Sequence, residues 1–184
     1  MRVLRPQEDW MGGVELLTDD SKRDLLIETA KAHGLHTLVE SGTYTGDTIA
    51  ALLPHMDKII SIELSPEHHK NAVERFHTSK VHLVFGDSGA LMPNLLKTFE
   101  GPALFWLDAH LSGVDSVGSH ADNPLRRELQ AIFENPAPES VVLIDDARFF
   151  GTSGWCSLDE IKLIVGPTWQ VTLIDDVVRI EKGP

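Results

Sequence analysis

The chain has 184 residues, of which 42% are hydrophobic and 24% are charged, with a formal net charge of −12 and a single cysteine, Cys156. This length suits one domain with a sizeable core, so we expect a single domain over residues 1–184. The negative charge argues against general binding to nucleic acid or to an anionic membrane. One cysteine cannot form an internal disulfide. No stretch approaches the ~18 uninterrupted apolar residues of a membrane span, and no apolar run typical of a secretory signal follows the first arginines. We therefore expect a soluble, cytoplasmic protein.

Short apolar runs alternate with segments of helical spacing along the chain. The runs predict strands at 36–40, 58–64, 81–85, 103–108 and 140–145. The helical spacing predicts helices at 21–32, 47–53, 66–77, 88–99, 124–135 and 157–165. Short, nearly continuous apolar strands separated by helices are typical of a parallel sheet covered on both faces.

The end of the chain has a different pattern. Two strand-like runs, 169–174 and 177–181, are separated only by Asp175 and Asp176. Two residues cannot make a parallel crossover, so this pair predicts an antiparallel hairpin, and the turn accounts for both aspartates. The sequence thus predicts an α/β, Rossmann-like, doubly wound and mostly parallel seven-stranded sheet with a C-terminal antiparallel hairpin.

Ligands of such sheets bind at the carboxyl ends of the strands, near the switch point beside the first strand. The first strand runs into the loop Glu40–Thr48 (ESGTYTGDT), where Gly42 and Gly46 let the backbone turn sharply and approach a ligand. The loop differs from the G-x-G-x-x-G fingerprint that binds a diphosphate. Glu40 would repel a diphosphate but can pair with an ammonium group, and S-adenosylmethionine carries both an ammonium and a sulfonium. The alternative is that the two glycines form only a tight turn.

Acids also follow the second and third predicted strands. Glu63 lies at the end of the second strand, where a carboxylate can accept both hydroxyl protons of a ribose. Asp87 follows the third strand and is placed to accept from an adenine amino group. The alternatives are structural, because Glu63 with Ser65, and Asp87 or Ser88, can cap the helices that follow.

The fourth and fifth predicted strands end at Asp108 and at Asp145-Asp146. Three carboxylates at one sheet edge repel one another unless they are protonated, separated or neutralised by a cation. Mg²⁺ accepts oxygen ligands from a few carboxylates, so these three aspartates are candidate metal ligands that could polarise an acceptor hydroxyl. His110 is the candidate base, since an imidazole titrates near neutral pH. The alternatives are a turn at Asp145-Asp146, backbone bonds to Asp108, or neutralisation by Arg148 without a metal.

Three strings carry a resemblance to a known family: Glu40–Thr48, Trp106–His110 (WLDAH) and Ile144–Arg148 (IDDAR). Over nearly its whole length the chain resembles class I S-adenosylmethionine-dependent methyltransferases, and in particular a group of small bacterial proteins with these strings. The aspartate placement is also similar to that of metal-dependent O-methyltransferases acting on sugars and catechols. The resemblance implies cofactor contacts at the loop and strand-end residues. With the residues singled out above, the candidate cofactor-binding set is Glu40, Gly42, Thr43, Tyr44, Gly46, Asp47, Thr48, Glu63, Asp87, Ser88 and Asp108.

These observations predict an S-adenosylmethionine-dependent methyltransferase that methylates a hydroxyl of a small molecule, sugar-like or catechol-like, by in-line displacement. The candidate catalytic residues are Asp108, His110, Asp145 and Asp146, with Mg²⁺ or another divalent cation as an optional partner of the three aspartates. The glycine- and serine-rich segment 111–122 is a candidate lid. Because the chain carries no inserted domain, either the acceptor is small or a second subunit of a homodimer completes its site.

Two other functions stay open at this point. A non-catalytic module would bind the cofactor without transferring its methyl group. A nicotinamide-dependent oxidoreductase is disfavoured by Glu40 and by the missing G-x-G-x-x-G fingerprint.

Overall fold

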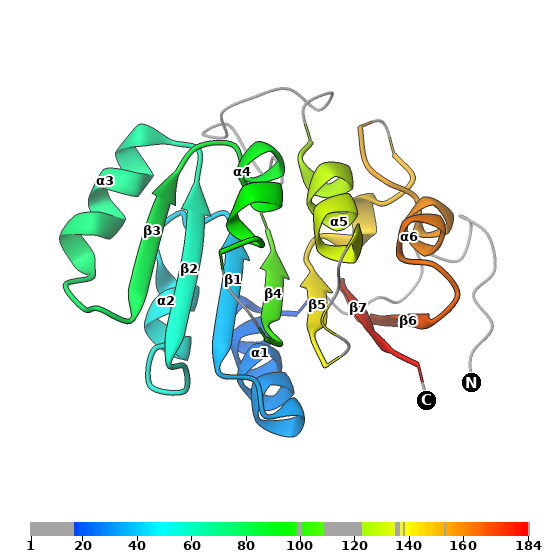
Figure 1. Cartoon of the computed structure of the whole chain (residues 1–184), viewed down its shortest axis with the longest axis horizontal. Helices are drawn as coiled ribbons and strands as arrows, with labels where there is room; N and C mark the ends of the chain where they lie inside the picture. Colours follow the sequence, from blue (N-terminus) through cyan, green and yellow to red (C-terminus); the bar gives the residue numbers. More distant parts are fainter. Residues whose placement is uncertain are drawn as a thin grey trace.

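Seven strands form one continuous sheet in the order β3-β2-β1-β4-β5-β7-β6 (Figure 1). The computed structural model describes residues 17–98, 101–108, 123–134, 137, 139–152 and 154–183. His110 and the candidate lid at 111–122 therefore lie outside the described residues. No helix in the described ranges has the length and apolar character needed to cross a membrane.

The predicted strands are confirmed, with small shifts at their ends. Their bounds are β1 Thr37–Ser41, β2 Lys58–Glu63, β3 Val81–Phe85, β4 Leu104–Leu107, β5 Val141–Ile144, β6 Trp169–Ile174 and β7 Val177–Lys182. β1 pairs with β2 and β4, β2 with β3, and β4 with β5, all in parallel. β7 pairs antiparallel with both β5 and β6, which confirms the predicted terminal hairpin.

The helices also follow the prediction. Their bounds are α1 Asp19–His33, α2 Asp47–Leu52, α3 Pro66–Arg75, α4 Ser88–Leu95, α5 Leu125–Glu134 and α6 Leu158–Val165, with a short 3₁₀ helix, η3, at Ala147–Phe149. α4 is shorter than predicted and ends at Leu95. Pro93 lies within it and supplies no N–H to the helical hydrogen bonds. Ser65 and Ser157 cap α3 and α6 through their hydroxyls, which explains where these helices begin.

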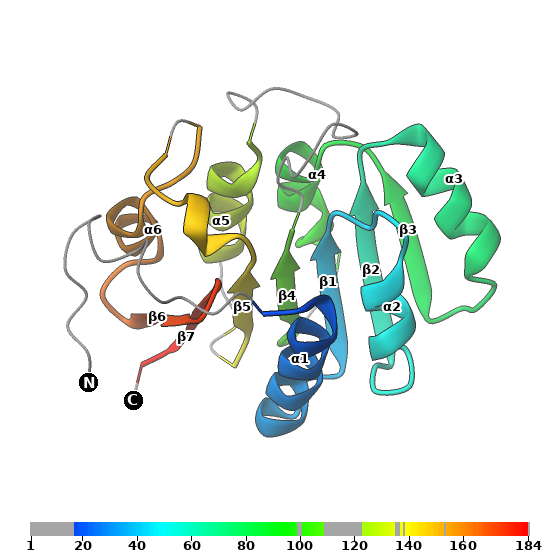
Figure 2. The same cartoon turned by 180° about the vertical axis from the view of Figure 1, so that it is seen from behind.

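The central strands are apolar on both faces because helices cover both. α1 and α2 lie on one face, and α4, α5 and α6 lie on the other (Figures 1 and 2). Along β1, Leu38 packs into the core under α1 and α2, and Val39 packs into the core under α4, α5 and α6. The same alternation continues in register across the neighbouring strands. The first layer contains Ile59, Leu104 and Val141, and the second contains Ile60, Phe105 and Val142.

Two features of the topology fix where a ligand can bind. The chain moves outward from β1 to β2 and β3 and then returns to the other side of β1 as β4, so the switch point lies between β1 and β4. β7 runs opposite to β5, with Ile144 opposite Val178. Since β7 is antiparallel, it begins at the edge where the parallel strands end. The turn before it therefore lies next to the end of β5, at the same edge of the sheet as the ends of β1 and β4.

Candidate active site

The loop after β1 turns sharply at its two glycines. Gly42 has a φ of 87° and its N–H donates to the carbonyl of Ile62, while Gly46 has a φ of 80° and precedes α2. A Cβ at Gly46 would lie 2.6 Å from Cε2 of Phe76. Gly46 is thus required by the packing of Phe76 as well as by its backbone conformation. The predicted tight turn is present, and the close approach at Gly46 is to a side chain of this protein.

Glu40 lies beneath this loop and is buried, with 1% of its surface exposed. The Ser61 hydroxyl donates to Oε2 of Glu40 at 2.5 Å, and the hydroxyls of Ser61 and Thr43 are 2.6 Å apart. Burial raises the pKa of Glu40 to about 8, although the hydroxyls of Ser61 and Thr48 oppose this shift. The sequence predicts an anion at this position, whereas in the free protein the carboxyl is mostly protonated at neutral pH.

Glu63, at the end of β2, is held by two backbone N–H groups. Tyr44 donates its N–H to Oε2 at 2.8 Å, and Ser65 donates its N–H to Oε1 at 2.7 Å. The side chain therefore ties the first loop to Ser65, the residue before α3. The hydroxyl of Ser65 caps α3, so the capping alternative is found for Ser65 and not for the Glu63 side chain. Each carboxylate oxygen can accept a second hydrogen bond, so a ribose is still compatible with this arrangement.

Asp87 and Asp47 each pair with an arginine. Asp87 precedes α4 without a side-chain capping bond and accepts from Arg127 at 2.9 Å. Capping by the Asp87 side chain is therefore not found. Asp47 accepts from Arg75 at 2.7 Å and from the Thr45 hydroxyl at 2.8 Å, and these bonds hold the pKa of Asp47 below its usual value.

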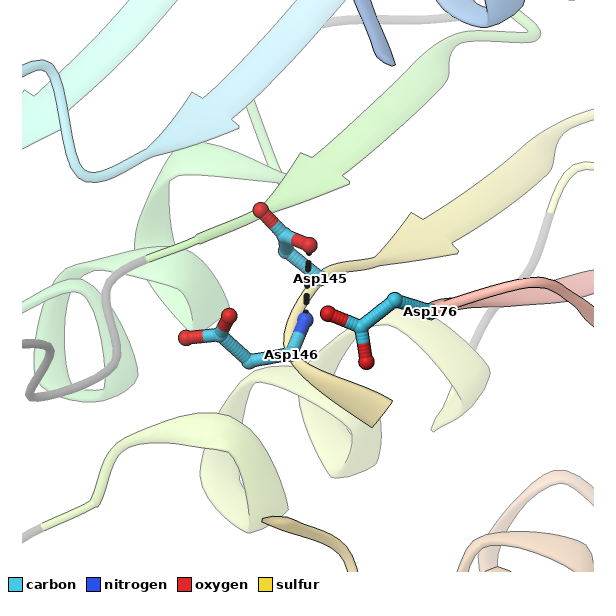
Figure 3. A group of neighbouring side chains, drawn as sticks. All are labelled: Asp145, Asp146 and Asp176. Carbon is cyan, nitrogen blue, oxygen red and sulfur yellow. Dashed lines mark hydrogen bonds between the residues drawn. The ribbon is translucent and has the colours of Figure 1, made fainter. Parts of the chain in front are cut away.

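The aspartates after β5 meet a third aspartate from the terminal hairpin. Asp145, Asp146 and Asp176 are buried, and one carboxylate oxygen from each lies within 4.8 Å of the others (Figure 3). The prediction that a turn accounts for Asp176 was incomplete. Asp175 has the positive φ of a turn residue, but the Asp176 side chain lies against the end of β5, because β7 begins at that edge.

Two side-chain cations neutralise this cluster in part. Lys22, from α1, lies 2.7 Å from Oδ2 of Asp145. Arg148, from η3, lies 2.6 Å from Oδ1 of Asp146 and also pairs with the carboxylate of Asp176. The alternative in which Arg148 neutralises the acids is therefore present in the structure.

Asp108 belongs to the same electrostatic environment. Its backbone N–H donates to the carbonyl of Ser41, which ties the ends of β4 and β1 together. Burial and the charges of Asp145, Asp146 and Glu40 raise the pKa of Asp108 well above its usual value, and Lys22 acts in the opposite direction. Burial also raises the pKa of Asp145 and of Asp146. A site that raises the pKa of several neighbouring carboxyls suits proton transfer or the binding of a cation.

Glu128 is a buried acid that the sequence analysis does not single out. It lies on α5 with no exposed surface, and neither carboxylate oxygen has a hydrogen-bond partner of normal geometry among the described residues. Burial raises the pKa of Glu128 to about 7, against the smaller opposing effects of the Ser88 and Ser41 hydroxyls. Glu128 therefore lies between the end of β1 and the start of α4. A signal was available, because position 128 falls on the apolar stripe formed by Leu125, Leu129 and Ile132.

The three-aspartate cluster has the oxygen donors that Mg²⁺ prefers, but most of these oxygens are already used. Asp145 accepts from Lys22 and from the Asp146 N–H at 2.7 Å each. Asp176 accepts from the Arg148 N–H at 2.8 Å and from its guanidinium, which also contacts Asp146. A divalent cation would have to displace Lys22 or Arg148, so this arrangement of side chains does not fit a resident metal.

Comparisons with known proteins place the fold among methyltransferases. No protein-family model and no curated protein sequence matches the chain. Among solved structures, the chain is similar to the O-methyltransferase TomG from Streptomyces achromogenes, which is involved in tomaymycin synthesis and is bound to S-adenosylmethionine. The TM-score is 0.68 and the sequence identity is 13%, over 97% of this chain and 90% of that one. The chain is also similar to the methyltransferase PaMTH1 from Podospora anserina, bound to S-adenosylhomocysteine. The TM-score is 0.65 and the sequence identity is 18%, over 91% of this chain and 80% of that one.

A third neighbour methylates a different kind of atom. The N-methyltransferase NodS from Bradyrhizobium japonicum gives a TM-score of 0.59 and 13% identity over 90% of this chain and 97% of that one. These likenesses confirm the predicted fold, the seven-stranded sheet shared with S-adenosylmethionine-dependent methyltransferases. Since both O- and N-methyltransferases share it, the fold leaves the acceptor atom open.

Proposed function

We propose that this protein is an S-adenosylmethionine-dependent methyltransferase that methylates a hydroxyl of a small molecule. The observation that carries the proposal is the row of acids at the carboxyl ends of the parallel strands, beside the switch point. Glu40 is the second-to-last residue of β1, Glu63 is the last residue of β2, and Asp87 lies two residues after β3. Asp108 and Asp145 directly follow β4 and β5. A cationic cofactor suits such an edge, whereas a diphosphate is repelled by it.

We assign the first three strand ends to the cofactor. Glu63 would accept hydrogen bonds from the ribose hydroxyls through the lone pairs that Tyr44 and Ser65 leave open. Asp87, with Ser88, would face the adenine. The loop Gly42–Thr48 would hold the methionine part, with Glu40 as the partner of its ammonium group.

The transferred methyl would then face Asp108, Asp145 and Asp146. In the reaction, a lone pair of the acceptor oxygen forms a bond to the methyl carbon while the carbon–sulfur bond breaks and its electron pair remains on sulfur. The hydroxyl proton passes to a base, for which His110 and Asp108 are the candidates. Placing the two reactants in line would supply much of the rate enhancement. Because Lys22 and Arg148 occupy the aspartate oxygens, no step of this proposal uses a divalent cation. The homodimer and the cytoplasmic location stay predictions.

Calorimetric titration with S-adenosylhomocysteine tests the cofactor assignment without knowledge of the acceptor. We expect S-adenosylhomocysteine to bind to the wild-type protein. We expect the nicotinamide dinucleotide NADH not to bind. Glu63→Ala should weaken binding about tenfold or more, because a buried carboxylate that accepts ribose hydroxyls is lost. Glu67→Ala is the matched control, since Glu67 is exposed on α3 one turn away.

The outcome separates the candidate functions. Binding of NADH in place of S-adenosylhomocysteine would support an oxidoreductase. Transfer of a radiolabelled methyl group from S-adenosylmethionine to members of a panel of sugars and catechols would identify an enzyme. Cofactor binding without transfer to any member of the panel would favour a non-catalytic module.

A further inference from the structure

Lys22 places a positive charge among the acids at the proposed transfer site. It lies in the first turn of α1, and its Nζ is 2.7 Å from Oδ2 of Asp145. Its partner is 123 residues away in the sequence, so this contact depends on the packing of α1 against the sheet. Lys22 lies on the buried face of α1, one turn before Leu26.

The surroundings of Lys22 differ from those of a surface ion pair. Its side chain is 14% exposed and that of Asp145 is 6% exposed, so the pair is largely shielded but can still be reached. Asp146 and Asp108 also attract the ammonium group. Ion pairs in such surroundings are screened far less than exposed ones.

Lys22 differs from Arg148 in how much of its hydrogen-bonding capacity is used. Arg148 contacts two carboxylates, and its backbone N–H donates to Asp176 as well. The Lys22 ammonium group makes one hydrogen bond to a described residue, the bond to Asp145, and it has three N–H donors. Lys22 can therefore donate to a bound molecule while remaining paired with Asp145.

We propose that Lys22 supplies the positive charge at the acceptor oxygen, so that methyl transfer needs no divalent cation. This inference rests on the proposed methyltransferase function and adds to it. The Lys22 ammonium would donate a hydrogen bond to the acceptor oxygen and stabilise the negative charge that develops as the hydroxyl proton leaves to the base. Lys22 itself neither gains nor loses a proton in this step.

Binding of Mn²⁺, measured by electron paramagnetic resonance of the free ion, tests the inference without an acceptor. If Lys22 occupies the place of a metal, wild-type protein should bind Mn²⁺ weakly. Lys22→Met should bind it about tenfold or more tightly, because a positive charge beside the carboxylates has been removed. Lys22→Arg keeps the charge and should behave like wild type. Lys31→Met is the matched control, since Lys31 is exposed near the other end of α1.

Thermal melting of each variant shows whether it is folded. Mn²⁺ binding to the wild type that is as tight as binding to Lys22→Met, or a gain that Lys31→Met shares, would overturn the inference. Should Lys22→Met fail to fold, the wild-type protein still decides. S-adenosylhomocysteine affinity that is unchanged by Mg²⁺ or by a chelator supports Lys22, and affinity that requires Mg²⁺ overturns it. Failure of the proposed function is separately visible as an absence of S-adenosylhomocysteine binding with and without Mg²⁺.

Discussion

Replacing Glu40 with glutamine should remove a pH dependence from cofactor binding. In the free protein Glu40 is buried, and its pKa is raised to about 8 by that burial. If the carboxylate pairs with the ammonium group of the cofactor, the protein must release this proton when it binds. The affinity is then proportional to the fraction of Glu40 that is ionised.

The size of the effect follows from this pKa. The ionised fraction is about 3% at about pH 6.5 and about 75% at about pH 8.5. The dissociation constant for S-adenosylhomocysteine should therefore decrease about 25-fold over this range. At about pH 7 roughly 0.9 protons should be released for each molecule bound.

Calorimetric titration in two buffers with different ionisation enthalpies measures both quantities. Glu40→Gln should bind with an affinity that varies little over the same range and should release no proton, because the amide stays neutral and can still accept from Ser61. A constant affinity of the wild-type protein without proton release would refute the reasoning. It would leave Glu40 as an anchor of the first loop only.

Two further predictions concern stability. Since the folded-state pKa of Glu128 is raised from 4.5 to about 7, its contribution to stability is complete below about pH 4.5 and is lost as the pH rises through about 7. Glu128→Gln should therefore be more stable than wild type by about 3 kcal/mol at about pH 8 and by less than about 1 kcal/mol at about pH 5. Urea unfolding at both pH values measures this difference, and lower stability of the variant at both would contradict the prediction. Gly46→Ala should lower the free energy of unfolding by about 2 kcal/mol, because φ is positive and Phe76 is too close. Gly34→Ala is its control, with a positive φ and open space; equal losses in urea unfolding would show that the contact with Phe76 does not matter.

Most of the fold could be predicted because its elements are encoded locally. Apolar runs marked the strands, capping residues marked several helix starts, and the two residues between the last runs allowed only a hairpin. The positions of the acids at one sheet edge followed from the parallel arrangement. These inferences need no knowledge of which distant residues meet.

The parts that could not be predicted depend on contacts between distant residues. Lys22 has no local signal for its contact with Asp145, since the packing of α1 determines which strand end it reaches. Asp176 reads as a turn residue until the strand order shows that β7 inserts beside β5. The protonated state of Glu40 depends on how completely the neighbouring elements exclude water, which residue types alone do not specify.

The insertion of β7 between β5 and β6 affects the order in which the site can be assembled. Asp176, in the turn before β7, accepts from the Arg148 N–H and pairs with its guanidinium, so the balance of charges at this edge is complete only when the last strand of the chain is in place. A fragment ending after α6 would leave β5 unpaired on one side and Arg148 without Asp176. Formation of the β6–β7 hairpin is thus needed to complete the charge pairs of the candidate site. A fusion that strains this hairpin would change those charge pairs without altering any residue that contacts the reactants.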